Sequence, residues 1–267
     1  MKVMRVLFSF TVCVLLVVIA YSSFSLWEIQ RNNAQEAQLH SRLLQYRPTA
    51  EMPASSDPVS ESSSEETSSN HSGLGAPHSP RPNQGIIDLQ VRHPDVVGWL
   101  TIPNTGVDYP FAQGKDNAHY LHLDLEQKRS AAGTIFMDFR NSQDFSDFNT
   151  ILFGHHMRNG SMFGSLQAFN SRTFFEENRT GMIFLPEKTY EIDFFAFAVI
   201  APDDAVIFDP TIQTEAEAAL FLDHVEQLAR YYRDINLTVH DRLVTLSTCN
   251  YEFDDARMVL VGRLSEI

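Results

Sequence analysis

The sequence is poor in cysteine and in basic residues. Its 267 residues include two cysteines, too few to build a disulfide framework. The 20 lysines and arginines are outnumbered by 34 aspartates and glutamates, which gives a formal net charge of −14. A nucleic-acid-binding protein needs a basic surface to release counterions from phosphates, so this balance excludes that class and we expect no nucleic-acid partner. No internal repeat is apparent.

Only one long hydrophobic run occurs, and it lies near the N-terminus. Residues 6–27 carry no charge and, as an α-helix, measure about 33 Å, enough to cross a hydrocarbon core of about 30 Å. Lys2 and Arg5 precede the run, which favours a cytoplasmic N-terminus and export of the remainder. A cleaved signal peptide is the alternative, because residues 20–22 include small residues at a plausible cleavage site. We expect a retained anchor, residues 1–27, because the run is long for a signal peptide.

The two cysteines differ in their position. Cys13 lies inside the hydrophobic run, so Cys249 is the only cysteine outside the expected anchor. It therefore has no intrachain disulfide partner, and an exported protein with one thiol either pairs with another chain or keeps the thiol for chemistry. A buried and inert cysteine is the other interpretation.

Composition divides the rest of the chain into a linker and a folded domain. Residues 28–85 start as a polar segment compatible with a short helix, and from residue 48 they contain 10 serines, 6 prolines and no aromatic residue. Such a stretch cannot bury enough apolar surface to offset its ordering entropy, so we expect a flexible spacer that holds the domain off the membrane. Residues 86–267 hold 17 of the 20 phenylalanines and form the predicted folded domain, which we expect to fold and act alone from about Gly85 onward.

The folded domain is predicted to be mainly β. Strand patterns occupy residues 98–102, 107–111, 133–139, 150–153, 182–185, 190–200, 243–248 and 257–264. Short helices are compatible with residues 86–97 and 117–125, and the clearest helical spacing covers residues 214–232. Many strands with one substantial helix predict a β-barrel with helical insertions.

The candidate chemistry lies in the last two predicted strands. Alternation along residues 245–249 places Ser247 and Cys249 on one face, whereas Leu246 points into packing. A seven-residue connection then brings Cys249 next to Arg257 at the start of the final strand. The guanidinium there can stabilise a thiolate, bind a carbonyl oxygen, or simply pair with a neighbouring aspartate.

His155 provides a third element. It follows a predicted strand and Gly154, and a histidine at a strand end can serve a thiol nucleophile as base or acid. A surface or capping histidine is the alternative. The 94 residues between His155 and Cys249 leave open, from spacing alone, whether the two side chains meet.

Two groups of residues have side chains that can bind metals, but neither group is good evidence for a metal site. His119 and His122 have a ligand-like interval, but two ligands do not make a zinc site. Asp138, Asp144 and Asp147 lack the spacing of an EF-hand. We therefore expect no metal site and no cofactor.

Taken in order, these segments resemble a sortase, and in particular the class B branch of that family. The central matches are Gly154-His155-His156-Met157 with Gly160-Ser161-Met162-Phe163, Thr245-Leu246-Ser247-Thr248-Cys249, and Arg257. Upstream matches are residues 98–100, 108–110, 113–117 and 136–141. The resemblance covers nearly all of residues 86–267, and the ordered set is more specific than any one short motif. The N-terminal anchor suits this branch too.

The resemblance implies a closed eight-stranded sortase-type β-barrel with helical insertions, preceded by an N-terminal transmembrane helix. It implies a cysteine transpeptidase held in the cell membrane by a single span, with an extracellular catalytic domain. Cys249 would attack a Thr carbonyl in the C-terminal sorting signal of an exported protein, with an Asn-Pro-x-Thr type signal as the first expectation. An amine of a peptidoglycan precursor or a pilin would then resolve the thioacyl enzyme.

The resemblance also assigns roles to single residues. His155, rather than His156, would protonate the leaving amine and deprotonate the incoming one, because the family's functional histidine directly follows the residue matched by Gly154. Arg257 would hold the substrate carbonyl and the oxyanion. Positions near the peptide groove are Asn141, Ser247, Thr248 and Asn250, the last with its backbone N–H as a second oxyanion donor.

Simpler roles stay open for two of these groove positions. Turn hydrogen bonding is the alternative for Asn141, and packing on a strand face is the alternative for Ser247.

Two other functions of the protein also stay open. One is a cysteine hydrolase that uses the same residues and passes the acyl group to water. The other is a non-enzymatic surface binding module in which Cys249 is inert.

Overall fold

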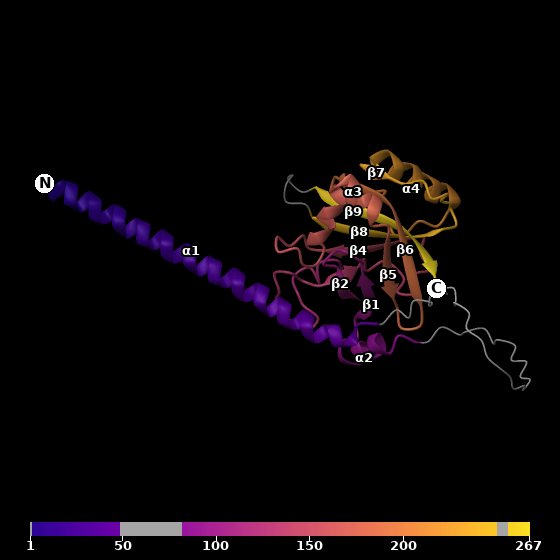
Figure 1. Ribbon diagram of the computed structural model, residues 1–267, viewed down its shortest axis with the longest axis horizontal. Coiled ribbons are helices and arrows are strands. Elements are labelled where there is room, and N and C mark those ends of the chain that lie inside the picture. The colour runs from indigo at the N-terminus through magenta and orange to yellow at the C-terminus, as the bar shows by residue number, and fades with distance from the viewer. Residues whose placement is uncertain (1, 49–81, 250–255) are drawn as a thin grey trace, which may run out of the picture.

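The computed structural model describes residues 2–48, 82–249 and 256–267 (Figure 1). Its helical elements are α1 (Lys2–Leu43), η1 (Leu44–Tyr46), α2 (Gln84–Arg92), η2 (Gly164–Asn170), α3 (Arg172–Glu177) and α4 (Glu215–Leu228). Its strands are β1 (Val96–Thr101), β2 (Asp108–Gln113), β3 (Ile135–Met137), β4 (Asn149–Gly154), β5 (Thr180–Phe184), β6 (Thr189–Ile200), β7 (Tyr231–Tyr232), β8 (Arg242–Cys249) and β9 (Arg257–Glu266). One predicted groove position, Asn250, lies outside the described residues.

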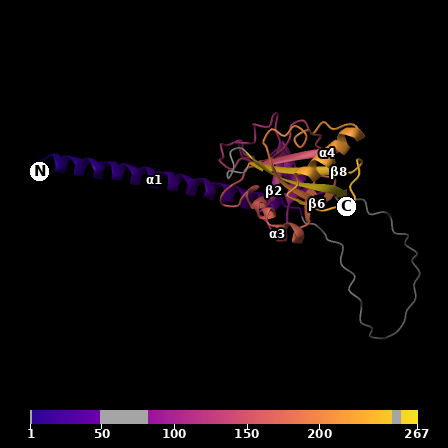
Figure 2. The same ribbon diagram turned by 90° about the horizontal axis from the view of Figure 1, so that it is seen from above.

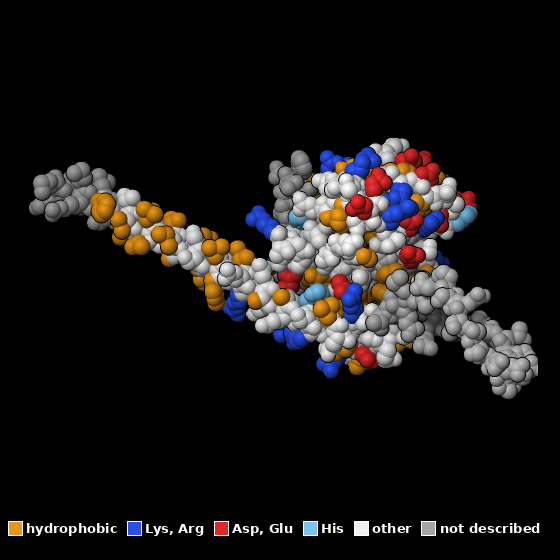
Figure 3. Space-filling view, viewed as in Figure 1, with side chains coloured by type: hydrophobic (Ala, Val, Ile, Leu, Met, Phe, Trp, Pro, Cys, Tyr) orange, Lys and Arg blue, Asp and Glu red, His pale blue; other side chains and the backbone are white. Residues whose placement is uncertain are grey.

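The N-terminal part of the chain is one long helix. No glycine or proline interrupts residues 2–46, and α1 therefore continues for 42 residues, about 63 Å, until the chain nears Pro48. The stretch Phe10–Tyr46 is long and apolar enough to cross a membrane. Figure 3 shows hydrophobic side chains along the part of α1 that projects from the barrel. The helix expected after residue 27 is present as the continuation of α1.

The predicted eight-stranded barrel is confirmed. Neighbouring strands follow the order β5-β1-β2-β3-β4-β8-β9-β6, and pairing of β5 with β6 closes the ring. The short β7 pairs with β6 alone, outside the ring. Two pairs, β2–β3 and β4–β8, are parallel, so the chain reaches them through long connections instead of hairpins. The pairing of β4 with β8 joins segments far apart in the sequence.

Strand alternation gives the barrel a filled interior and a covered outer face. Large apolar side chains fill the interior, among them Leu100, Phe111, Ile135, Phe145, Leu152, Val244, Leu246 and Leu260. On the outside, Leu243, Val259 and Val261 pack with Phe221 and Val225 of α4. A capping box, in which Thr214 and Glu217 bond each other's backbone N–H groups, starts α4. The helix ends earlier than predicted, because Arg230 and Arg233 donate backbone hydrogen bonds to β6.

One predicted helix is wrong. Residues 117–125 form turns, because their carbonyl groups pair across the chain instead of along it. The Tyr120 carbonyl accepts from the Thr134 backbone N–H at 3.0 Å, and the His122 carbonyl accepts from Ser130 at 3.1 Å. The Tyr120 hydroxyl donates to Asp95 at 2.7 Å, which holds this segment against the start of β1.

The C-terminal end of α1 is packed on the barrel (Figures 1 and 2). Leu43 is buried in a cluster that includes Ile86, Leu89 and Trp99. Two ion pairs hold the same region, between Arg42 and Glu126 at 3.0 Å and between Arg47 and Asp108 at 3.0 Å.

The two ends of the Ser/Pro-rich segment lie together on the domain. The backbone carbonyl of Tyr46 occupies the space that a side chain at Gly85 would fill. Residue 46 ends η1 on one side of the segment, and Gly85 is the second residue of α2 on the other. The described residues on either side of the segment, which flank residues 49–81, therefore lie next to each other. The predicted spacer itself lies outside the described residues.

Candidate active site

Strand register brings three predicted residues to one end of the barrel. In the parallel pair of β4 and β8, Gly154 lies opposite Thr248, and the next residues along the two strands are His155 and Cys249. In the antiparallel pair of β8 and β9, Cys249 lies opposite Arg257. Neighbouring strands are about 4.8 Å apart. The backbones at positions 155, 249 and 257 therefore follow one another across three adjacent strands.

Strand alternation assigns two of these positions, 249 and 257, to the outer face of the barrel. Val244 and Leu246 of β8 and Met258 of β9 point inward, as their place in the interior cluster shows. Leu243 and Val259 belong to the outer cluster. Because alternation has a period of two, positions 249 and 257 fall in the outward set.

A pocket of about 330 Å³ lies beside His155 and Arg257. Its apolar part is formed by Phe136, Phe153 and Phe208. The ring centroid of Phe153 lies 5.4 Å from that of Phe136 and 6.1 Å from that of Phe208. The connection between β6 and α4 closes one side with residues 202–205. Charged side chains, among them Asp203, Asp204 and Arg257, line the rest of the pocket.

His155 is set up to accept a proton. Its ring Nε2 lies 2.7 Å from the backbone carbonyl oxygen of Leu121. Since a carbonyl only accepts, Nε2 carries the ring proton and Nδ1 keeps its lone pair in the neutral imidazole. Burial lowers the pKa of His155 below its ordinary 6.5, and the charges of His122 and Arg257 lower it further against the opposing effect of the Leu121 bond. The neutral form therefore dominates at neutral pH.

The turn after β4 fixes the backbone of His155 and separates it from His156. A side chain at position 154 would meet the ring of Phe163 at 2.8 Å, so only glycine allows this contact. The Phe163 backbone N–H donates to the His155 carbonyl at 3.1 Å. The next residue, His156, pairs with Met162 and places Nε2 3.1 Å from Gln167 Oε1. His155, but not His156, lines the pocket beside Arg257.

A buried carboxylate supports the pocket wall. Asp138 is fully buried and accepts two hydrogen bonds from the Arg140 guanidinium, at 2.9 and 2.8 Å, and one from Asn117 at 2.9 Å. Burial raises the pKa of Asp138, but these bonds outweigh burial and hold it below the ordinary value. Arg140 also donates to the Phe208 carbonyl at 3.0 Å. The pair thus ties the residues after β3 to the connection between β6 and α4.

Asn141 acts as a support inside the turn. It is 5% exposed, and its Oδ1 accepts from the Ile151 backbone N–H at 2.9 Å while its Nδ2 donates to the Asn149 carbonyl at 2.9 Å. These are the bonds that a neighbouring strand would make with β4. The arrangement fits the alternative of turn hydrogen bonding, and the predicted place of Asn141 near the peptide groove stays a prediction.

Ser247 and Thr248 are also buried completely, two residues and one residue before the strand end at Cys249. Their contact with substrate stays a prediction. Asn149, a residue that sequence analysis missed, links β4 to β8 and to the connection between β6 and α4 through hydrogen bonds. Asn149 accepts a hydrogen bond from the Thr245 hydroxyl at 2.8 Å and donates to the Ile207 carbonyl at 3.2 Å. The parallel pairing of β4 and β8 brings Asn149 and Thr245 together.

Among the described residues, no group of three or more histidine, cysteine, aspartate or glutamate side chains is arranged to hold a metal ion. His119 instead lies 3.0 Å from the Gln127 side-chain oxygen. Asp147 accepts from the Ser142 backbone N–H at 2.6 Å, and Asp144 accepts from that of Ser146 at 3.0 Å.

Comparison with known proteins gives consistent matches. The family model described as the sortase domain matches residues 100–265. Sortase B of Listeria monocytogenes is 38% identical over 182 residues, which are 66% of this chain and 72% of that protein. A Staphylococcus aureus sortase B–substrate complex superposes with a TM-score of 0.66 at 31% identity, covering 71% of this chain and 88% of that one. Clostridium perfringens sortase B superposes with a TM-score of 0.64 at 30% identity, covering 67% and 98%.

Proposed function

This chain belongs to the sortase family of cysteine transpeptidases, in the class B branch, and from that premise we propose that Cys249, His155 and Arg257 carry out its reaction. As a sortase it acts on proteins that bear a sorting signal. The proposed signal is of the Asn-Pro-x-Thr type and is cleaved after the Thr. The observation that supports the assignment is the register that aligns positions 155, 249 and 257 on adjacent strands.

The first half of the proposed reaction forms a thioacyl enzyme. His155 Nδ1 takes the thiol proton, and the Cys249 sulfur attacks the Thr carbonyl carbon. The Arg257 guanidinium holds the resulting oxyanion. The C–N bond then breaks, and His155 returns the proton to the leaving amine. The low pKa of His155 supports this cycle, because a neutral imidazole accepts a proton and an imidazolium formed beside Arg257 gives it up readily.

The second half transfers the acyl group to an amine. The amine nitrogen attacks the thioacyl carbon, His155 takes the amine proton, and the C–S bond breaks to restore the thiolate. The proposed acceptor is a peptidoglycan precursor or a pilin. The helix α1 is able to anchor the chain in a membrane, and we place its N-terminus in the cytoplasm because Lys2 and Arg5 precede the apolar run. The barrel then lies outside the cell.

The experiment uses the full chain in detergent micelles with fluorescent peptides that carry candidate signals. Intact-protein mass spectrometry should detect an acyl adduct on Cys249, and Cys249→Ala should abolish it. The partition of product between added amine and water separates a transpeptidase from a hydrolase. A chain that forms no adduct and whose thiol labels slowly would instead be a binding module.

A further inference from the structure

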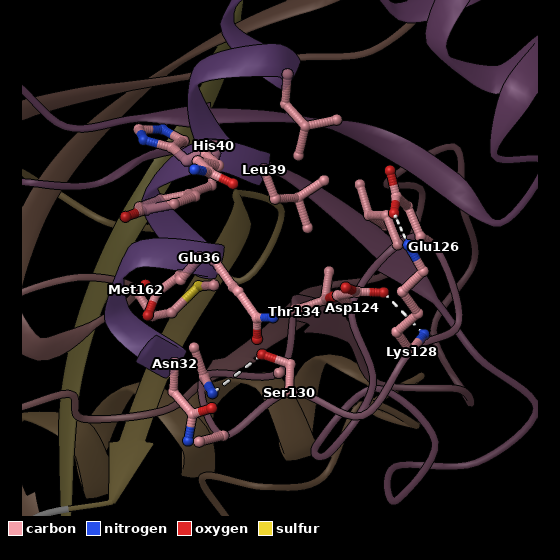
Figure 4. A pocket seen from close by; sticks show the side chains of 18 of the residues that line it. Asn32, Glu36, Leu39, His40, Asp124, Glu126, Lys128, Ser130, Thr134 and Met162 are labelled. Carbon is pink, nitrogen blue, oxygen red and sulfur yellow. Dashed lines mark hydrogen bonds and ion pairs between the residues drawn. The ribbon is translucent and has the colours of Figure 1, made fainter. Parts of the chain in front are cut away.

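A second cavity, of about 400 Å³, lies between the C-terminal turns of α1 and the barrel (Figure 4). Asn32, Glu36, Leu39 and His40 line it from one side of α1, at spacings of three and four residues that share a helix face. Residues 124–135 form the opposite wall. The pocket beside Arg257 has a different lining, so the two hollows are distinct.

Glu36 is an acidic group of this cavity whose carboxylate is only partly satisfied by described residues. Glu126 forms ion pairs with Arg42 at 3.0 Å and with Lys128 at 2.6 Å. Asp124 accepts from the Lys128 backbone N–H at 2.9 Å. Glu36 hydrogen-bonds with Ser161 and interacts electrostatically with His40, but its Oε1 is buried without a hydrogen-bond partner. A buried carboxylate oxygen is costly unless a donor reaches it, and a cationic donor satisfies both its charge and its lone pairs.

The cavity leads toward the catalytic histidine. Asn32 and residues 129–131 line both this cavity and a smaller hollow that contains His122. The His122 ring lies 6.0 Å from the His155 ring, centroid to centroid. Met162, on the other side of the cavity, pairs with His156, the residue after His155. A ligand in the cavity can therefore extend along α1 to the His122 side of His155.

We propose that this cavity binds the acceptor of the transfer step, and that Glu36 pairs with a second cationic nitrogen of that acceptor. The inference rests on the proposed function. The amine that reacts must give its proton to His155 as its nitrogen bonds to the thioacyl carbon and the C–S bond breaks. That nitrogen cannot remain paired with Glu36, so the carboxylate recognises a different cationic group on the same molecule. The acceptor class is a compound with two amino groups, or an amine with a guanidinium.

The test measures preference among small acceptors with the full chain in detergent and one cleavable signal peptide. The probes are α,ω-diaminoalkanes, from diaminoethane to diaminooctane, each compared with the monoamine of the same chain length. For the best chain length, we expect the kcat/KM of the wild-type chain for the diamine to exceed that for the monoamine about tenfold, the range for a hydrogen bond to a charged group. Glu36→Gln should bring the ratio close to one, and Glu36→Asp should retain most of it.

The matched control is Glu187→Gln, which removes the same charge from an exposed turn between β5 and β6. It should keep the wild-type ratio. The ratio is internal to each variant, so a loss of folded enzyme does not change it. A wild-type ratio near one, or an unchanged ratio in Glu36→Gln, overturns the site while signal cleavage continues. Absence of any acyl adduct in the wild-type chain overturns the proposed function, and this inference with it.

Discussion

Replacing Arg257 with alanine should slow transfer by about two to three orders of magnitude. Loss of one oxyanion donor typically costs about 2.7–4 kcal/mol, whereas loss of a surface ion pair costs about 0–1 kcal/mol. The structure favours the larger figure. Arg257 lies opposite Cys249 in the sheet, lines the pocket beside His155, and acts on the charge of that histidine. Arg257→Lys keeps the charge without the planar fork and should remain seriously impaired.

The same variant should change the pH profile in a defined direction. The positive charge of Arg257 lowers the pKa of His155, so its removal raises that pKa toward the ordinary value. Because the neutral imidazole is the base, the acid limb of kcat/KM lies below pH 6.5 in the wild-type chain and moves to higher pH in Arg257→Ala. In Arg257→Lys the limb should stay near its wild-type position, because the charge remains.

The assay combines steady-state peptide cleavage from pH 5 to 8 with NMR titration of His155 and a thermal unfolding control. Near-normal turnover in Arg257→Ala, with the barrel folded, would show that the arginine is structural. An acid limb that moves in the opposite direction, or equally in both variants, would refute the electrostatic part of the argument.

Three further predictions follow from the site and the fold. Asp138→Asn should weaken the bonds with Arg140 and lower the stability of the barrel by about 2 kcal/mol, or about 4–8 °C in Tm by calorimetry, whereas the exposed control Asp223→Asn should stay within about 0.5 kcal/mol. His155→Ala should abolish peptide cleavage and His156→Ala should retain most of it, and equal losses in two folded variants would contradict the assignment. A fragment of residues 82–267 should fold, but chemical denaturation should find it about 2–3 kcal/mol less stable than residues 30–267, because it lacks Leu43 and the ion pairs of α1. Equal stability would mean that the α1 contacts contribute nothing.

Local patterns predicted the strands well, because alternation and turn residues act over a few positions. The register of Cys249 opposite Arg257 follows from two adjacent strands joined by a short connection, which the sequence makes visible. The contact between β4 and β8 is different. Nothing in residues 149–154 indicates that their neighbour lies about ninety residues further on, and this parallel pairing is what brings position 155 beside position 249 on the next strand. Only the family resemblance anticipated it.

The misplaced expectations share a physical cause, which is pairing between distant segments. The turns of residues 117–125 exist because Tyr120 and His122 give their carbonyl groups to residues 130–134, beyond the reach of helical periodicity. The family resemblance placed Asn141 and Ser247 near the peptide groove, which stays a prediction. The hydrogen bonds of Asn141 with the backbone of β4 were not visible in the sequence for the same reason, since they too join separate segments. The packing of α1 on the barrel could not be predicted from the sequence either. Its contact residues are arginines and leucines, which are common on any amphipathic helix face.

The meeting of Tyr46 with Gly85 has a consequence for shedding from the membrane. In a protein tethered by a linker, one proteolytic cut in that linker frees the catalytic part at once. Here a cut between residues 49 and 81 leaves two fragments that still share the buried Leu43 cluster and the pairs of Arg42 and Arg47. Separation of the barrel from α1 then requires dissociation of a noncovalent complex in addition to the cut, so the two fragments stay together for as long as that interface lasts.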